Sequence, residues 1–134
     1  MVYAFDTNVI VHYLHNNPSV SANFHRAVMD NYKIVVPKMV DYEIRRGFVI
    51  KPNPRREAEY NALVSECDIV DIVTSTWDYA MHVYAGHYRD RHTVGEIDIL
   101  IASLCLQNNY VLVTNNTNDF ANVDGLAIVD WSQE

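Results

Sequence analysis

The sequence contains few of the residues that cross-link a chain. Its 134 residues include only two cysteines, Cys67 and Cys105, which lack the paired spacing of a zinc site. Two thiols alone do not make the disulfide framework of a small secreted protein. We therefore expect both cysteines to be packing residues in a reduced protein of the cytoplasm.

Long hydrophobic runs are also missing. No apolar run reaches the roughly 20 residues of a membrane span, and the first residues lack the basic flank and cleavage site of a signal peptide. Hydrophobic residues still make up 49% of the chain, which suits a globular protein with a packed core. We expect one domain over residues 1–134 and no membrane partner.

Positive charge is scarce and unevenly placed. The formal net charge is -7, and no Lys or Arg follows Arg91. A negative protein is a poor partner for phosphate groups as a whole. The basic residues nevertheless gather in two clusters, which are Arg45, Arg46, Lys51, Arg55 and Arg56, and then Arg89 and Arg91. These clusters indicate either solvated helix ends or a local positive rim.

Short apolar strands alternate with helices along the chain. Strands are expected over about residues 2–5, 32–36, 69–73, 111–114 and 126–129, with helices over about 9–14, 18–28, 38–49, 55–66, 76–91 and 97–106. In the helix over 55–66, we expect Ala58, Ala62 and Leu63 to face the core. This alternation predicts an α/β fold, with a central parallel sheet of about five short strands flanked by helices on both faces.

Three acidic residues occupy unusual places in this pattern. Asp6 lies at the turn between the first strand and the first helix, where an Asp commonly caps a helix. Asp98 lies in EIDILIASLCL, on a face that should be buried, although the first turn of a helix also favours an acid. Glu43 lies at the edge of an apolar stripe, although a single Glu on a helix is usually exposed to solvent.

A fourth group of polar residues follows the fourth strand, in LVTNNTNDFANV. Thr114, Asn116 and Asp119 are adequate there as turn formers. In a parallel sheet, however, residues that follow neighbouring strands meet at one edge. Several carboxylates can share one small site only if a divalent cation neutralises them, and ligands that are all oxygen favour Mg²⁺ or Mn²⁺. The chemistry predicted is metal-assisted hydrolysis of a phosphodiester.

The motifs together resemble those of PIN-domain nucleases, and especially the VapC toxins of toxin–antitoxin modules. FDTNVIVHYL, DYEIRRG, VGEIDILIASL, VLVTNNTNDF and GLAIVDW follow one another in the family's order along nearly the whole chain. The resemblance implies a PIN-like fold and an endoribonuclease toxin, commonly of tRNA or rRNA. It also implies a homodimer that a VapB-like antitoxin neutralises.

The resemblance assigns roles to individual residues. It makes Asp6, Glu43 and Asp98 catalytic and metal-binding. The fourth acid is less settled, because many members carry an acid where this chain has Asn116, whereas others use the position of Asp119. We take Asp119 as the fourth catalytic residue, and one-metal and two-metal mechanisms both stay open. The supporting residues are Thr7, Asn8, Thr114 and Asn116, and the expected RNA-binding residues are Arg45, Arg46, Arg55, Arg56, Arg89 and Arg91.

Other readings fit the residues less well. A phosphorelay receiver needs an acid pair after the first strand, but Thr7 and Asn8 follow Asp6. A haloacid-dehalogenase phosphatase needs a second Asp where Asn8 stands. A PIN module without catalytic activity is the more serious alternative. We expect His12 and His15 to be a surface pair without a role.

Overall fold

The computed structural model describes residues 1–133 and contains a five-stranded sheet in which every neighbouring pair is parallel. The strands are β1 (Val2–Phe5), β2 (Lys33–Pro37), β3 (Asp68–Val70), β4 (Val111–Val113) and β5 (Ile128–Val129). Their order across the sheet is β3-β2-β1-β4-β5. The sequence-based prediction of a parallel α/β sheet is confirmed.

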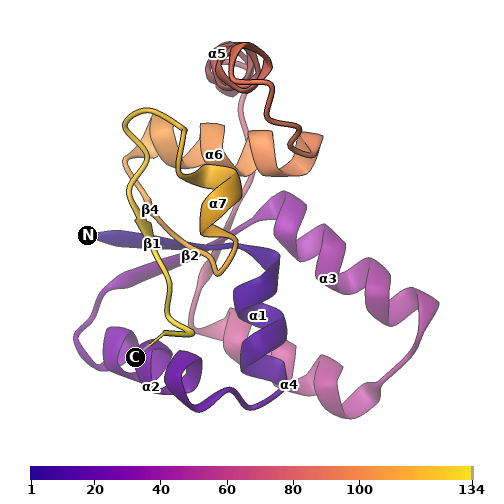
Figure 1. The fold of residues 1–134 in the computed structure, drawn as a ribbon. Helices are drawn as coiled ribbons and strands as arrows, with labels where there is room; N and C mark the ends of the chain where they lie inside the picture. Colours follow the sequence, from indigo (N-terminus) through magenta and orange to yellow (C-terminus); the bar gives the residue numbers. More distant parts are fainter. Residues whose placement is uncertain (134) are drawn as a thin grey trace.

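Seven helices connect and cover the strands. They are α1 (Thr7–Leu14), α2 (Pro18–Met29), α3 (Lys38–Ile50), α4 (Pro54–Ser65), α5 (Thr76–Arg89), α6 (Glu96–Asn108) and the single turn α7 (Thr117–Phe120). In Figure 1 the sheet is seen nearly edge-on, with α5 and α6 on one side and α1, α2 and α4 on the other. Among residues 1–133, no helix is both long and apolar enough to cross a membrane.

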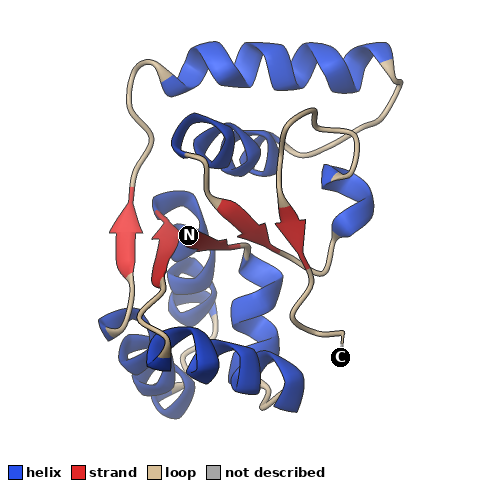
Figure 2. Cartoon of the chain, turned by 90° about the vertical axis from the view of Figure 1, so that its left-hand side faces the viewer, coloured by secondary structure: helices blue, strands red, loops and turns tan. Residues whose placement is uncertain are grey.

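The strand order creates a switch point beside the first strand. The chain adds β2 and β3 on one side of β1 and then returns to place β4 on the other side. Figure 2 shows the parallel strands at the centre, between the two layers of helices. In such sheets a crevice forms where neighbouring strands send their connections to opposite faces. Here that point is the carboxyl end of β1 and β4, which Asp6 and Thr114 follow.

The core lies on both faces of the central strands. Val35 and Leu112 are fully buried in β2 and β4, and Ile10 and Ile101 pack from helices on opposite faces. Such complete burial explains why these strands are short continuous apolar runs without polar alternation.

Two details of the predicted elements are wrong. Ala58 and Ala62 are exposed, and α4 instead buries Tyr60 and Leu63. Tyr60 is favoured inside because its hydroxyl donates to the buried Asp41 carboxylate at 2.7 Å. The third strand ends at Val70, and as an edge strand it is only partly buried.

Candidate active site

Asp6 lies at the switch point and serves two local purposes. Its backbone N–H donates to the Val113 carbonyl at 3.0 Å, which continues the pairing of β1 with β4. Its carboxylate caps α1 by accepting from the Thr7 N–H at 2.7 Å. The Thr114 hydroxyl donates to the other carboxylate oxygen at 2.8 Å. Asp6 is only 4% exposed, so these bonds fix its direction.

Asn8 joins the two strand ends. Its side-chain amide N–H₂ group lies 3.2 Å from Asp6 Oδ2 and 3.3 Å from Thr114 Oγ1, and its oxygen accepts from the Asn115 N–H at 3.1 Å. Asn8 therefore connects residues that are more than 100 positions apart in the sequence. Of the residues expected to support the site, Thr7, Asn8 and Thr114 bond to Asp6, whereas Asn116 bonds to Thr114 and Asp119.

Glu43 and Asp98 reach the same site from two further helices. Glu43 extends from α3, where the Thr7 hydroxyl donates to its Oε1 at 2.7 Å. Asp98 lies in the first turn of α6. Asp6, Glu43, Asp98 and Asn116 all line one open cavity of about 360 Å³. The structure thus brings together three of the four predicted acids around a shared space.

The carboxylates perturb one another. Burial raises the pKa of Asp98 to about 6, and the negative charges of Asp6, Asp119 and Glu43 contribute to the rise. Burial also raises the pKa of Asp6, against the hydrogen bonds from Thr114, Thr7 and Asn8 that lower it. The ionised site is therefore energetically unfavourable without a compensating positive charge.

The donor set fits a hard divalent cation. The acids around the cavity offer only oxygen atoms, and like charges brought together at partly buried positions are what such a cation relieves. Within residues 1–133, no three His, Cys, Asp or Glu side chains already form a metal-binding group.

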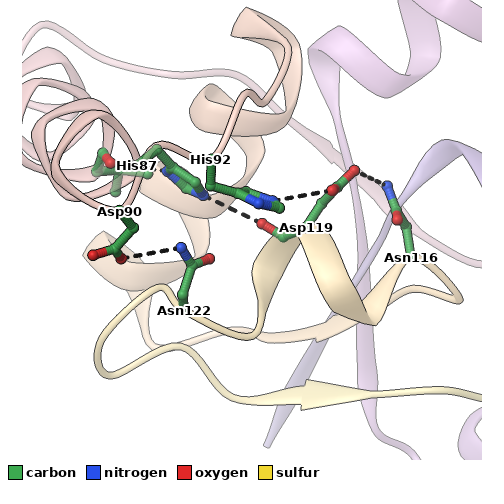
Figure 3. Close-up of polar contacts among 7 residues, drawn as sticks. His87, Asp90, His92, Asn116, Asp119 and Asn122 are labelled. Atoms are coloured by element: carbon green, nitrogen blue, oxygen red, sulfur yellow. Dashed lines mark hydrogen bonds and ion pairs between the residues drawn. The ribbon is translucent and has the colours of Figure 1, made fainter.

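Asp119 is placed differently from the other acids. It lies at the third position of α7, and it does not line the acidic cavity. One carboxylate oxygen lies 3.2 Å from His92 Nε2, and the other accepts from the Asn116 side-chain N–H₂ group at 2.6 Å (Figure 3). Sequence reasoning gave His92 no role, because its contact spans 27 residues and leaves no local signal.

The two histidines that were expected to form a surface pair, His12 and His15, differ in their exposure. His15 is exposed, whereas His12 is half-buried at the rim of the acidic cavity beside Asn115. The local spacing that placed both on one helix face could not show that the loop after β4 covers only one of them.

The basic residues occupy two separate regions of the structure. On α3 and α4, Arg45 is bound to Asp41 at 3.0 Å and covers the Tyr60 ring, so it stabilises the fold. Two other arginines of that cluster pair with acids on their own helices, Arg46 with Glu43 and Arg55 with Glu59. The last two basic residues, Lys51 and Arg56, line a groove of about 570 Å³ between α1 and α3.

Arg89 and Arg91 belong to the second region. They line a cavity of about 610 Å³ together with His92 and two tyrosines, Tyr84 and Tyr88. The same cavity is lined by Ile99, the residue next to Asp98. The cavity of the second positive region and the acidic cavity thus share no lining residue, but consecutive residues of α6 line them.

Comparison with known proteins places this geometry in a wider group. The chain is 25% identical to "Ribonuclease VapC2" of Rickettsia felis over 134 residues, covering 99% of this chain and all of the relative. It is 28% identical to "tRNA(fMet)-specific endonuclease VapC" of Shigella flexneri, covering 97% and 98% of the two chains. A solved structure, that of VapBC2 from Rickettsia felis bound to a DNA fragment from their promoter, also matches. Its TM-score is 0.89 at 25% identity, and the match covers 98% of this chain and 99% of that chain.

The family model described as "PIN domain" matches residues 3–126, which contain β2, β3, β4, most of β1, the helices α1 to α7 and all four acids. The match includes the strand ends and helix starts that carry the acidic cavity. The resemblance seen in the sequence motifs is thereby confirmed, and the chain belongs to the PIN domain family.

Proposed function

We propose that this protein is a cytoplasmic endoribonuclease toxin that depends on Mg²⁺ or Mn²⁺. The observation that carries the proposal is the convergence of Asp6, Glu43 and Asp98 on one cavity, with the pKa of Asp98 raised to about 6 by burial and the neighbouring acids. The names of the VapC relatives, which are a ribonuclease and a tRNA endonuclease, support RNA as the substrate. The proposed RNA class is tRNA or rRNA.

The site contains two groups of residues, which are the acids that bind the cation and the polar residues that orient those acids. Asp6, Glu43 and Asp98 bind the cation through their carboxylates, and Thr7, Asn8 and Thr114 keep two of those carboxylates in place by hydrogen bonds. A bound divalent cation would activate water and stabilise the charge that develops on the phosphodiester. Deprotonation of Asp98 accompanies metal binding, because a carboxylate must lose its proton before it becomes a ligand.

The RNA backbone would be held outside the acidic cavity. Arg89 and Arg91 are exposed and line the cavity beside His92. Arg56 lines the groove between α1 and α3, which Glu43 also lines. If these contacts hold phosphates, RNA affinity falls steeply between 50 and 200 mM salt. Affinity that does not change over this range would contradict the role given to the arginines.

The decisive experiment is cleavage of a total tRNA pool by the purified protein with Mg²⁺, with Mn²⁺ and with EDTA. The wild type is compared with Asp6→Asn and Asp98→Asn, and with Asp78→Asn as an exposed control on another helix. The proposal expects metal-dependent cleavage that both site variants lose and the control keeps. Cleavage that persists in EDTA, or in both site variants, would contradict it.

The proposed partners are a VapB-like antitoxin and a second copy of this chain. The antitoxin is supported by the solved VapBC2 complex of the Rickettsia felis relative. Its expected target is the acidic cavity, since a basic side chain inserted there would relieve the repulsion among the carboxylates. When this chain is co-expressed with a VapB-like antitoxin, the two proteins should co-purify, and the complex should no longer cleave RNA.

The homodimer is supported by an apolar stripe on α5. Trp77, Met81, Tyr84 and Tyr88 recur at helical spacing and are each more than half exposed. An exposed patch of this kind indicates a surface that another protein covers. Sedimentation should show a dimer, and Trp77→Lys with Met81→Lys should convert it to a monomer while the single chain stays folded.

A PIN module without catalytic activity is the alternative function. It keeps the fold and the partner surfaces but binds no cation. Calorimetry with Mn²⁺ separates the two functions, because the proposed enzyme binds Mn²⁺ and the alternative does not.

A further inference from the structure

The side chain of Asn116 has a defined orientation because of its partner. Its N–H₂ group donates to Asp119 Oδ2 at 2.6 Å. A carboxylate can only accept, so the amide nitrogen must face Asp119 and the amide oxygen must face away from it. Asn116 lines the acidic cavity with Asp6, Glu43 and Asp98, whereas Asp119 does not. The amide oxygen is therefore the polar side-chain atom of Asn116 that the bond to Asp119 leaves available to the cavity.

Two histidines fix Asp119 from the other side. His92 Nε2 lies 3.2 Å from Asp119 Oδ1, and because the carboxylate only accepts, this nitrogen carries the proton. The His87 ring stacks on His92 with 5.5 Å between centroids, and its Nε2 lies 3.3 Å from the Asp119 main-chain carbonyl. His87 itself is 5% exposed and bound to the Val83 carbonyl at 2.9 Å. Figure 3 shows these contacts joining α5 and the loop after it to α7.

The loop needs this support because its own structure is short. α7 has only four residues, and its N-cap, Asn116, makes no side-chain capping bond. The Asn116 N–H is held by Thr114 Oγ1 at 2.9 Å, and Thr114 donates to Asp6. The backbone of Asn116 is thus connected to the first acid, and its side chain is connected to Asp119.

We propose that Asp119 is a positioning residue, and that His92 and Asp119 together orient Asn116 so that its amide oxygen serves as a neutral ligand for the cation bound by Asp6, Glu43 and Asp98. The proposal rests on the metal site of the proposed function. It changes the role expected of Asp119 from the sequence, in which that residue was the fourth catalytic acid.

A neutral oxygen at this position agrees with the charges around it. The three carboxylates of the cavity already repel one another, and an amide oxygen adds a ligand without adding to that repulsion. The negative charge of Asp119 still affects the site, because it contributes to the raised pKa of Asp98. Residues that orient a ligand typically change metal affinity by roughly 10 to 100-fold when they are removed.

The test is a charge exchange between the two positions, read as Mn²⁺ affinity by calorimetry on the full chain. The double variant Asn116→Asp with Asp119→Asn preserves the net charge and the hydrogen bond, with donor and acceptor reversed. If residue 116 faces the cation, the exchange puts a carboxylate on it, and affinity rises by about tenfold, which is about 1.4 kcal/mol. If Asp119 is itself the ligand, the exchange removes that charge and affinity falls, which would overturn the proposal.

Single variants examine the same arrangement. Asp119→Asn still accepts from Asn116 and should stay within about threefold of the wild type, whereas Asp119→Ala and His92→Ala should each weaken Mn²⁺ binding by roughly tenfold. His92→Gln keeps an N–H donor and should recover most of the loss. An Asp119→Asn variant as weak as Asp119→Ala, or no recovery by His92→Gln, would count against positioning. Thermal melts in EDTA confirm that each variant is folded.

Metal affinity keeps this proposal separate from the proposed function. A wild type that binds Mn²⁺ but cuts no RNA would contradict the nuclease, while the exchange experiment would still decide the role of Asp119. A wild type that binds no Mn²⁺ would overturn both proposals.

Discussion

Replacing Asp98 with Asn should stabilise the protein when no metal is present. The carboxylate lies in the first turn of α6, half-buried, and burial together with the charges of Asp6, Asp119 and Glu43 raises its pKa from 3.8 to about 6. Each pKa unit corresponds to about 1.4 kcal/mol, so the full penalty of the ionised form in the folded state is about 3 kcal/mol. Because the side chain is partly exposed and solvent screens its charge, we expect about 1–2 kcal/mol.

The effect should depend on pH with a definite sign. A carboxyl whose pKa is raised by folding favours the folded state fully below its unfolded pKa near 3.8, and this advantage is lost as the pH rises through about 6. Asp98→Asn should therefore match the wild type near pH 4 and exceed it at pH 7.5, where the Tm in EDTA should be higher by about 3–8 °C.

The control for this experiment is another first-turn acid. Asp78 lies in the first turn of α5, as Asp98 lies in the first turn of α6, but the Asp78 side chain is exposed. Asp78→Asn loses only a favourable interaction with the helix dipole, so its Tm should not rise. Saturating Mn²⁺ should reverse the order at pH 7.5, since a ligand at 100 times its Kd stabilises the wild type by about 2.7 kcal/mol. An Asp98→Asn variant with an unchanged or lower Tm in EDTA at pH 7.5 would refute the view that repulsion strains this site.

Three further measurements examine other parts of the structure. Thr114→Val removes the hydroxyl that donates to buried Asp6 and should cost about 1–3 kcal/mol in urea unfolding, whereas Thr114→Ser should cost much less; equal losses would contradict the role of the hydroxyl. Tyr60→Phe removes the 2.7 Å bond to Asp41 and should cost about 1–2 kcal/mol while Mn²⁺ affinity is unchanged, so a change in affinity would argue against a structural role. Burial raises the pKa of the Cys105 thiol to about 12. Iodoacetamide at pH 8 should therefore label this thiol only after unfolding. Rapid labelling of the native protein would show instead that the core around Cys105 opens.

Much of the fold could be read from the amino-acid pattern because local forces set it. Short apolar runs alternate with helical segments, and in a chain of this kind connections are right-handed and the sheet is parallel. The same logic placed Asp6 and Thr114 at one sheet edge, since both directly follow strands that end there. It failed for α4, where Tyr60 is buried and Ala58 is exposed, because the buried partner Asp41 comes from another helix.

The site shows where local pattern stops being informative. An acid in an apolar helix, such as Asp98, is conspicuous because its burial costs free energy that needs a reason. Asp119 and Asn116 are ordinary turn residues, and the sequence around them gives no sign of the contact between Asp119 and His92. Their contacts depend on how α7 packs against α5 and the loop that follows it, which brings residues 27 positions apart within hydrogen-bonding distance. Residue types and spacing therefore indicated the candidate acids, whereas the packing of distant segments determined which of their side chains line the cavity.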